Sequence, residues 1–374
     1  MDQHHYDVII IGAGPAGCAT ACKLNTDDMR VCLIDEVDRK SFKVGGALPA
    51  KALPLLNTLG IRELSDILRS NEYSSYIANI SSWGSEEWND TDNLTHDKKG
   101  GWHVLRHRFD TALRNYTRLR GATLRKNRVM KIHTSPGEIN AFQVHFADDS
   151  QPISSTWLVD ASGRKGFVTK QLGINRIQYG RQMAIIYWIK SPIEDNDHTT
   201  RIKSIRNGWF YTSLLPGDTR MLSFQGLPQD IAELTRSPDI FFEMFNQAEL
   251  LPYPISMSDV VEGPEATLAN VSKPEIIAGP GWLSVGDAAI AFDPLTSYGI
   301  SFALYSGIQA AEAISTSMYY PWMEKDMFTM FCSTINRVFD KKQKARQYHY
   351  TCEKRYQDHP YWQQYKPEIY VHEQ

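Results

Sequence analysis

Two glycine-rich segments at opposite ends of the chain constrain the fold more than any other feature. The first, residues 9–17 (IIIGAGPAG), contains a GxGxxG pattern, and the second, residues 283–289 (LSVGDAA), contains a Gly-Asp turn about 270 residues later. A lone GxGxxG pattern has little specificity. The combination predicts that the fold brings both ends of the chain to one bound dinucleotide.

The first segment has the features of a pyrophosphate-binding loop. A short run of apolar, mostly branched residues at 6–11 predicts a buried parallel strand before the glycines. Gly12 permits a tight turn, Gly14 lets the backbone approach a pyrophosphate, and Gly17 lets the next helix pack on the strand. The alternative is a glycine turn in a different kind of βα unit.

A helix is expected directly after these glycines. Pro15 and Ala16 stand at its start, and the apolar pattern continues to about residue 24. The free N–H groups and the dipole of a helix N-terminus favour an anion. The sequence therefore places a pyrophosphate at this end of the helix.

An acidic residue follows the second predicted strand, residues 30–34. Asp35 lies 23 residues after Gly12, where an acid accepts hydrogen bonds from the adenosine ribose. Glu36 is adjacent, so the choice between these two acids stays open.

The chain does not divide into two consecutive domains. We expect a nucleotide-binding domain with C-terminal helices from residues 1–75, 102–175 and 273–374. An inserted sheet domain for the substrate is expected from residues 76–101 and 176–272.

The expected elements follow from hydrophobic periodicity. Residues 71–101 read as a polar loop, and residues 102–120 as a strand leading into an amphipathic helix with Leu119 on its apolar face. Further strands are expected at 183–189, 202–205, 209–214 and 220–225, and helices at 52–59, 228–248, 299–317 and 324–356.

Composition limits the partners of the chain. The formal net charge is −3, which gives no indication of nucleic-acid binding. No apolar run approaches the roughly 20 residues of a membrane span, and the N-terminus enters a strand without a signal-peptide pattern. We therefore expect a cytoplasmic protein that binds neither nucleic acid nor membrane.

The five cysteines form no metal-ligand or CxxC pattern, and their odd, sparse count is typical of a reducing compartment. Cys18 and Cys22 lie one helical turn apart, after the glycine loop. Buried small residues are the favoured interpretation there, and a redox pair is the alternative. No metal site is expected.

Five segments in order along the chain carry a family resemblance: Gly12–Gly17, Val104–Asp110, Leu158–Arg164, Gly286–Asp287 and Asp293–Ile300. With them, the chain resembles the FAD-dependent monooxygenases of the aromatic hydroxylase and tryptophan halogenase superfamily. The resemblance implies an α/β fold: a Rossmann-like FAD-binding domain with an inserted antiparallel-sheet substrate domain. It also implies FAD as the cofactor.

Three further runs, Lys43–Pro49, Gly208–Pro216 and Tyr348–Tyr361, resemble a narrower group. These flavoproteins mature the tryptophylquinone amino-acid oxidases that act on lysine or glycine. The resemblance implies hydroxylation of a tryptophan side chain in an oxidase precursor, with a reductant of unknown identity. The alternatives are a flavin-binding chaperone of that partner, or a hydroxylase or reductase of a small indole or phenol.

The resemblance also implies roles for residues at the flavin end. Asp287, after Gly286, matches the aspartate that bonds the ribityl chain. Gly299 and Ile300 match a backbone N–H pair at a helix start beside the flavin pyrimidine, where a helix N-terminus stabilises negative charge. Lys43 belongs to the flavin-side loop.

Four more residues are implied at the nucleotide end. Arg106 matches an arginine near the phosphates or the ribityl chain, and Val129 matches a residue whose backbone meets the adenine. Asp160 and Ala161 match the motif under the nucleotide.

Because the cofactor carries the hard chemistry, few catalytic side chains are expected. Trp209, Tyr211 and Phe224 are the candidates on the sheet, and Pro294 and Tyr298 are the candidates at the flavin. The alternative for each is an ordinary place in the core.

The chain departs from the halogenases in three ways. Their Trp-x-Trp-x-Ile-Pro signature is absent, with Trp188-Ile189 as the nearest fragment, and Gly45-Gly46 stands where their loop has Gly-Glu. No lysine in 71–100 matches the one that handles hypohalous acid, and Lys98 and Lys99 are expected to be solvated. Halogenation is not expected.

A protein substrate needs an accessible surface beside the flavin. We expect that surface in the 71–101 loop and the 176–272 sheet, with Trp83, Trp88 and Trp209 as aromatic anchors. The alternative is that these tryptophans belong to the core and the substrate is a metabolite.

Overall fold

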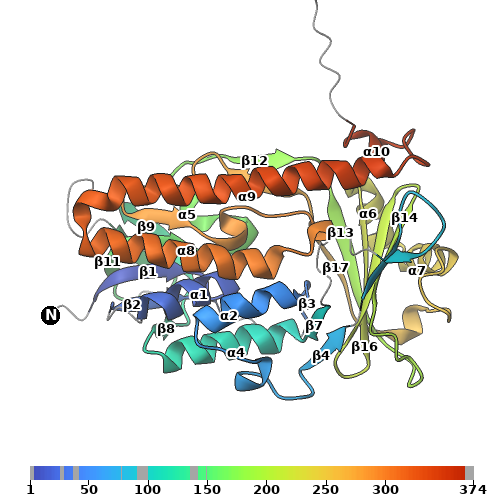
Figure 1. Ribbon diagram of the computed structural model, residues 1–374, viewed down its shortest axis with the longest axis horizontal. Helices are drawn as coiled ribbons and strands as arrows, with labels where there is room; N and C mark the ends of the chain where they lie inside the picture. Colours follow the sequence, from blue (N-terminus) through green and yellow to red (C-terminus); the bar gives the residue numbers. More distant parts are fainter. Residues whose placement is uncertain are drawn as a thin grey trace, which may run out of the picture.

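The computed structural model describes residues 4–25, 29–36, 42–76, 78–90, 100–134, 142–148 and 150–366. Figure 1 shows two parts side by side: an eight-stranded sheet with helices, and a seven-stranded sheet at the other end of the molecule. The long helix α9 (Glu324–Cys352) runs along both parts. This arrangement confirms the predicted α/β fold class with a separate sheet, which is antiparallel except for the parallel pair β14 and β5.

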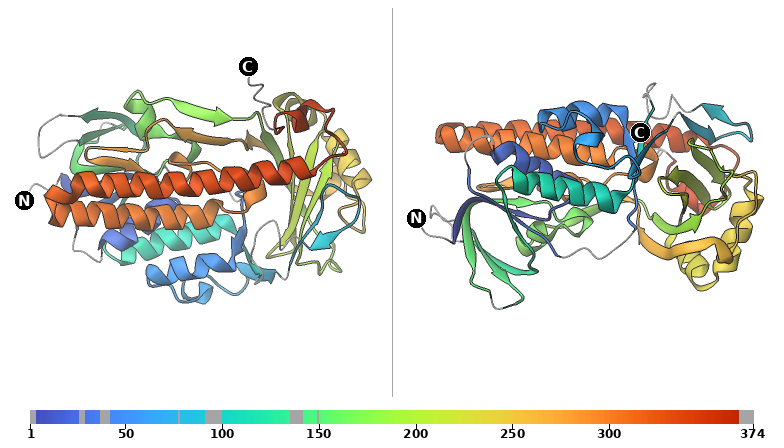
Figure 2. Two further views of the ribbon diagram at one scale, coloured as in Figure 1. Left: turned by 45° about the horizontal axis from the view of Figure 1, so that its top comes forward. Right: turned by 90° about the horizontal axis from the view of Figure 1, so that it is seen from below.

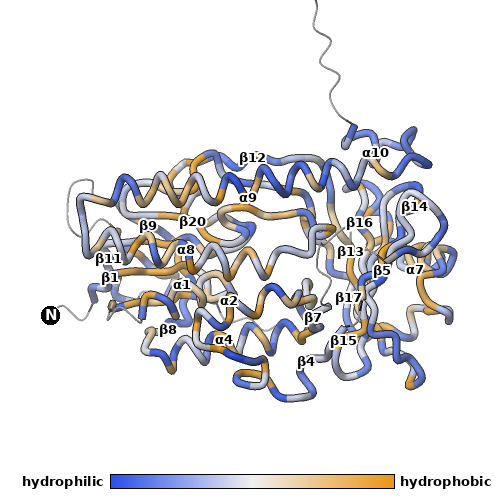
Figure 3. The backbone as a smooth tube through the Cα atoms, in the orientation of Figure 1, coloured by the Kyte–Doolittle hydropathy of each residue, from blue (hydrophilic) through white to orange (hydrophobic). Residues whose placement is uncertain are grey.

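The larger sheet contains the glycine-loop strand at its centre. Its parallel strands are β20 (Trp282–Ser284), β11 (Ile153–Asp160), β1 (His5–Ile11), β2 (Val31–Ile34) and β8 (Thr123–Arg125), in that order. The antiparallel strands are β9 (Val129–Thr134), β10 (Phe142–Phe146) and β19 (Ala278–Gly279). The last four residues of β1 are buried, as expected for a strand covered on both faces. Figure 3 shows hydrophobic segments at the centre of this sheet.

Helices cover this sheet and fix where the two glycine segments meet. They are α1 (Pro15–Leu24), α2 (Leu53–Thr58), α4 (Arg106–Leu119), α5 (Phe167–Gln171) and α8 (Gly299–Tyr319). Helix α8 approaches α1 so closely that a Cβ at Gly307 would lie 2.5 Å from the Ala16 carbonyl oxygen. This contact packs the third turn of α8 against the start of α1. Both views in Figure 2 show α9 alongside α8.

The seven-stranded sheet has one face in its own core and one face toward the nucleotide-binding part. Its strands are, in spatial order, β17 (Val260–Leu268), β13 (Met183–Lys190), β16 (Thr219–Gly226), β15 (Gly208–Leu215), β14 (Thr200–Ile205), β5 (Asn79–Ser82) and β6 (Asn89–Asp90). Helices α6 (Pro228–Arg236) and α7 (Pro238–Gln247) cover the first face, where Phe210 and Phe224 pack with Phe241 and Phe245.

Smaller elements connect the two parts. They are the sheet β3 (Ala47–Pro49), β7 (Gly101–Val104) and β4 (Tyr73–Tyr76), the ribbon β12 (Arg176–Tyr179) with β18 (Val271–Pro274), and α10 (Pro360–Gln363). Single helical turns lie at Ala50–Ala52, Leu64–Asp66, Gly163–Lys165, Met257–Asp259, Gly286–Ala288, Pro294–Thr296 and Pro321–Met323. In the described part of the chain, no helix is both long and apolar enough to cross a membrane.

Three sequence expectations about elements are wrong. The predicted loop at 71–101 contains β4, β5 and β6, and β7 begins at its end. The predicted helix 228–248 is two helices, because Pro238 has no N–H to donate and Ser237 before it is extended, with φ −130° and ψ 76°. Helix α9 ends at Cys352 rather than 356.

A fourth correction concerns Leu119, expected on the buried face of α4. Its side chain is 78% exposed, because it stands at the last residue of the helix. Leu113 and Phe109, about two and three turns earlier in α4, are buried.

Candidate active site

A cavity of about 420 Å³ lies between the glycine segments and the inner face of the seven-stranded sheet. The nucleotide side contributes Gly14, Pro15, Ala16, Val44, Gly45, Arg106, Ala161, Arg164, Gly286, Asp287, Phe292, Pro294, Tyr298, Gly299 and Ile300. The sheet side contributes Ala184, Ile186, Trp209, Tyr211, Met221, Ser223, Gln225, Thr267 and Leu268. The fold thus brings thirteen of the predicted site residues to one cavity.

The three glycines of the first segment serve different needs. Gly12 has φ +108°, and a Cβ there would lie 2.3 Å from the Ala161 carbonyl oxygen. A Cβ at Gly17 would lie 2.0 Å from the Gly12 carbonyl oxygen. A Cβ at Gly14 would meet no atom of the described protein within 4 Å. Gly12 and Gly17 are therefore required by internal packing, whereas Gly14 leaves open space at the N-terminus of α1.

The Gly-Asp turn closes against this loop. Gly286 has φ +56°, a Cβ there would lie 2.8 Å from the Cβ of Ala16, and its N–H donates to Ser306 Oγ at 2.8 Å. The guanidinium of Arg176 donates to the carbonyl of Ala288 at 2.8 Å. These contacts hold the Asp287 backbone in place and leave its carboxylate 37% exposed at the cavity.

Two arginines of this region were missed by sequence reasoning. Arg164 lies with Nε 3.5 Å from Asp287 Oδ2, and it also donates to the carbonyls of Asn270 and Phe292. Burial lowers the pKa of Arg176 to about 10. Arg164 ends one of the family-like segments, but Arg176 lies outside every motif and had no sequence signal.

The turn before α8 is held by a buried ion pair between Asp293 and Arg346. Asp293 Oδ1 accepts from the Leu295 N–H at 3.0 Å, and Oδ2 accepts from Arg346 Nε at 2.8 Å. Ser297 then adopts φ +44°, and the helix begins at Gly299. The first N–H groups of a helix have no partner within it, so Gly299 and Ile300 present donors to the cavity.

The flavin-side loop is tied to α4 by three charges. Arg106 donates to the Val44 carbonyl at 2.8 Å and to Asp110, and Lys43 Nζ lies 3.1 Å from Asp110 Oδ2. Burial acts to raise the pKa of Asp110, but the charges of Arg106 and Lys43 outweigh it and hold that pKa below its ordinary value. Arg106 lines the cavity, whereas Lys43 does not and acts through Asp110.

The predicted adenosine residues lie outside the cavity. The Gly12 N–H donates to the Ile34 carbonyl at 2.7 Å, which places Asp35 directly beside the glycine loop. Asp35 is half-buried, and burial raises its pKa. Glu36 is 59% exposed and lies 3.7 Å from Arg128. These positions favour Asp35 as the ribose acceptor.

Val129 and Asp160 are also outside the cavity lining. Val129 begins β9 at the edge of the large sheet and is partly buried there. The carboxylate of Asp160 accepts from the backbone N–H groups of Ser162, Val168 and Thr169, so it braces the start of α5. Its neighbour Ala161 lines the cavity.

One prediction on the substrate side is wrong. It concerns the face of the seven-stranded sheet that lines the cavity, called the sheet wall below. Phe224 points away from the cavity into the core under α6 and α7, because strand residues alternate between faces. Its neighbours Ser223 and Gln225 line the cavity instead. Sequence reasoning missed both, although each is paired in register with a predicted residue, Tyr211 with Ser223 and Trp209 with Gln225.

Trp209 lies on the face of the sheet that lines the cavity. Its side chain is fully buried, and Nε1 donates to the Tyr350 hydroxyl at 3.0 Å. Trp83 packs edge-on against Trp209 and Trp362. The expectation that Trp209 is a surface anchor is therefore wrong, whereas Trp83 is partly buried. Trp88 is 36% exposed.

The buried cysteines do not form a redox site. Cys18 and Cys22 are free thiols inside α1, with Cys22 Sγ 3.1 Å from Thr117 Oγ1. Burial raises the pKa of Cys22 to about 11, which disfavours the reactive thiolate. The small-residue interpretation holds.

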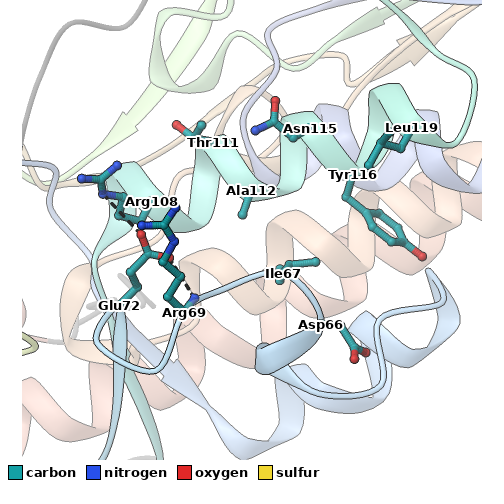
Figure 4. Close-up of a pocket in the computed structure, with 10 residues that line it drawn as sticks. All are labelled: Asp66, Ile67, Arg69, Glu72, Arg108, Thr111, Ala112, Asn115, Tyr116 and Leu119. Atoms are coloured by element: carbon teal, nitrogen blue, oxygen red, sulfur yellow. Dashed lines mark hydrogen bonds and ion pairs between the residues drawn. The ribbon is translucent and has the colours of Figure 1, made fainter.

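A second cavity of about 300 Å³ lies on the outer side of α4, against residues 61–72 (Figure 4). Glu72 there accepts from the Arg69 N–H at 2.9 Å and lies 3.5 Å from Arg108 Nε. None of the predicted site residues lines this cavity. It is separate from the candidate active site.

Comparisons with known proteins agree with a flavin site. Residues 5–213 match the sequence model of a family described as an FAD binding domain. The putative FAD-dependent oxidoreductase LodB of Marinomonas mediterranea is 26% identical over 376 residues, which cover 96% of each chain. The 1H-pyrrole-2-carbonyl peptidyl-carrier-protein brominase of Pseudoalteromonas luteoviolacea is 27% identical over 325 residues, or 84% of this chain and 78% of the brominase.

A solved structure shows the same fold. It is that of QhpG, a peptidyl tryptophan dihydroxylase, with a TM-score of 0.79 and 21% identity. The match covers 98% of this chain and 79% of that chain.

Proposed function

The chain belongs to the FAD binding domain family, and from that premise we propose that it is a monooxygenase that hydroxylates a tryptophan side chain of a partner oxidase precursor. It is an FAD-dependent oxidoreductase. The substrate domain is proposed to comprise residues 76–101 and 176–272. Lys98 and Lys99 lie outside the described residues.

One observation carries the proposal. The same cavity is bounded by the nucleotide loop, the Asp287 turn and the α8 N-terminus on one side, and by Tyr211, Ser223 and Gln225 on the other. A ring on the sheet wall therefore lies next to any cofactor held by the glycines. When bound, FAD supplies the activation of dioxygen with electrons from a reductant.

Residues of this chain perform the remaining tasks. The open space at Gly14 would admit a pyrophosphate at the start of α1, and Asp287 would accept from a ribityl hydroxyl. The N–H groups of Gly299 and Ile300 stabilise negative charge beside the helix start. Ile186 and Met221 give the sheet wall an apolar surface that excludes water from a reactive centre. Pro294 and Tyr298 border the cavity where the two sides meet.

The relatives support a protein-borne substrate. QhpG is described as a peptidyl tryptophan dihydroxylase essential for tryptophylquinone cofactor biogenesis, and the brominase acts on a ring attached to a carrier protein. Hydroxylation is favoured over halogenation because the halogenase tryptophan signature is missing. Trp188, its nearest fragment, packs against Phe42 and does not line the cavity.

The test is co-expression with a tryptophylquinone oxidase precursor, followed by mass spectrometry of the precursor peptides. We expect added oxygen on a tryptophan, and no addition with a Gly14→Val enzyme. Parallel cultures with added bromide test the halogenase alternative, because a halogenase would give a brominated peptide. Turnover of free indole without any change in the precursor would contradict a protein substrate while leaving the oxygenase chemistry in place.

A further inference from the structure

One buried polar atom on the cavity wall has no partner within the described protein. Gln225, in β16, is 3% exposed and lines the cavity. Its Nε2 donates to Ser223 Oγ at 2.7 Å, but its Oε1 has no hydrogen-bond partner among the described residues. A buried acceptor left unsatisfied is costly, so its partner is expected to be a ligand of the cavity.

The surroundings of this atom define the chemistry of that ligand. Tyr211 is next to Ser223 across the strands, and Ile186 and Met221 supply apolar surface on the same face. The charged residues that line the cavity, Arg106, Arg164, Asp287 and Asp293, all belong to the nucleotide side. The sheet wall therefore suits a neutral, flat, largely apolar group that carries one hydrogen-bond donor.

We propose that Gln225 Oε1 accepts the ring N–H of an indole bound against the sheet wall, with Ser223 fixing the orientation of the amide. This inference rests on the proposed function, because it identifies the indole with the tryptophan of the partner. Gln225 is a specificity residue in this scheme. It holds the ring without taking part in bond making.

The test uses oxidised holoenzyme without reductant, so that binding is measured apart from turnover. Calorimetric titration compares indole with benzofuran, which keeps the two-ring frame and replaces the N–H by an oxygen. Because the N–H is the only donor of the ring, we expect the ratio of the two affinities to fall roughly ten- to hundredfold in Gln225→Met.

Two matched variants control for the shape and the chemistry of the wall. Gln225→Glu keeps an acceptor and is expected to keep the preference for indole. Met221→Leu changes an apolar neighbour on the same strand and is also expected to keep it. FAD affinity is expected to be unchanged in all three variants.

Three results would overturn the assignment. One is an unchanged affinity ratio in Gln225→Met, and another is no indole binding at millimolar concentration. The third is a loss of FAD affinity in Gln225→Met with no change in the preference for indole over benzofuran. That result would indicate that Oε1 bonds to the flavin. Failure of the proposed function looks different: the ring preference would depend on Gln225, but the precursor would gain no oxygen.

Discussion

Single residues in the glycine loop separate folding from cofactor binding. Gly14 has φ −77°, a value that any L-residue adopts, and its Cβ position is empty. We therefore expect Gly14→Val to fold and to lose FAD, because the side chain occupies the space of the pyrophosphate. Flavin content per folded chain, with circular dichroism as the folding control, measures this.

The neighbouring glycine is the matched comparison. Gly12→Val places its side chain on the Ala161 carbonyl, so we expect that variant to be poorly folded. Full flavin occupancy in a folded Gly14→Val protein would mean that the open space is not the pyrophosphate site.

Asp287 offers a second test at the residue scale. Its carboxylate faces the cavity, and its Oδ2 lies 3.5 Å from Arg164 Nε. Removing a charge-assisted hydrogen bond to the ribityl chain in Asp287→Ala is expected to weaken FAD binding roughly ten- to hundredfold. Flavin fluorescence titration gives the dissociation constant. An equal dissociation constant for FAD in wild type and Asp287→Ala would show that Asp287 does not bind the cofactor.

At the scale of elements, β7 joins the small connecting sheet to the seven-stranded sheet through a buried histidine. His103 is fully buried, stacks on Tyr76 and has Nε2 3.1 Å from Thr200 Oγ1 in β14. Burial lowers the pKa of His103 to about 3. The ordinary pKa of histidine, about 6.5, applies to the unfolded chain.

This histidine makes stability depend on pH. Between about pH 6.5 and pH 3 the unfolded chain binds a proton that the folded chain does not, so acid favours unfolding. We expect the stability advantage of wild type over His103→Gln to shrink by up to about 1.4 kcal/mol per pH unit in that window. Urea unfolding at pH 7, 6 and 5 tests it, with the exposed His4→Gln as control. If the difference in unfolding free energy between wild type and His103→Gln does not vary with pH, the lowered pKa of His103 is refuted.

The elements also show which features were predictable from sequence. The strand–loop–helix at the N-terminus and the strands of the inserted sheet carry strong periodicity, and the structure has them. Strands β4 and β5 (YSSY and NISS) are short and rich in serine, so they lack an apolar alternation that distinguishes them from a loop. Phe224 was misplaced because residue type alone does not tell which face of a strand meets the cavity.

Much of the site depends on long-range contacts that no local pattern contains. The role of Arg176 arises from its packing against Asp287 and Ala288, more than a hundred residues later. Tyr350 reaches Trp209 from the end of α9. The domain boundaries stay a prediction.

At the scale of the whole molecule, the end of α9 joins parts that are distant in sequence. Glu353 is fully buried and accepts from Ser204 Oγ at 2.6 Å, from the Gly84 N–H at 3.0 Å and from Arg355. Burial acts to raise the pKa of Glu353, but the hydrogen bonds from Arg355 and Ser204 outweigh it and lower the pKa below its ordinary value. Glu353 thus remains charged and connects α9 to β14 and to the turn after β5.

Removing this carboxylate is expected to destabilise the fold strongly. Glu353→Ala breaks the buried ion pair with Arg355 and removes the acceptor of the Gly84 N–H, although Arg355 keeps Glu86 and Ser204 keeps the Ser82 carbonyl. We expect this loss to cost about 3 kcal/mol. Urea unfolding followed by circular dichroism measures the loss. The exposed Glu312→Ala on α8 is the control, expected within about 0.5 kcal/mol of wild type. Equal stabilities of the two variants would show that Glu353 does not join these parts.

The packing of α8 on α1 has a consequence for biosynthesis. The glycine loop is synthesised about 270 residues before Gly286, Gly299 and the helix that covers α1. Until then the face of α1 that packs against α8 has no cover, and contacts of such long sequence separation form slowly. We therefore expect the cofactor site to be complete only after α8 has been made, and a shortage of flavin to prolong the exposure of the new chain to aggregation and proteolysis.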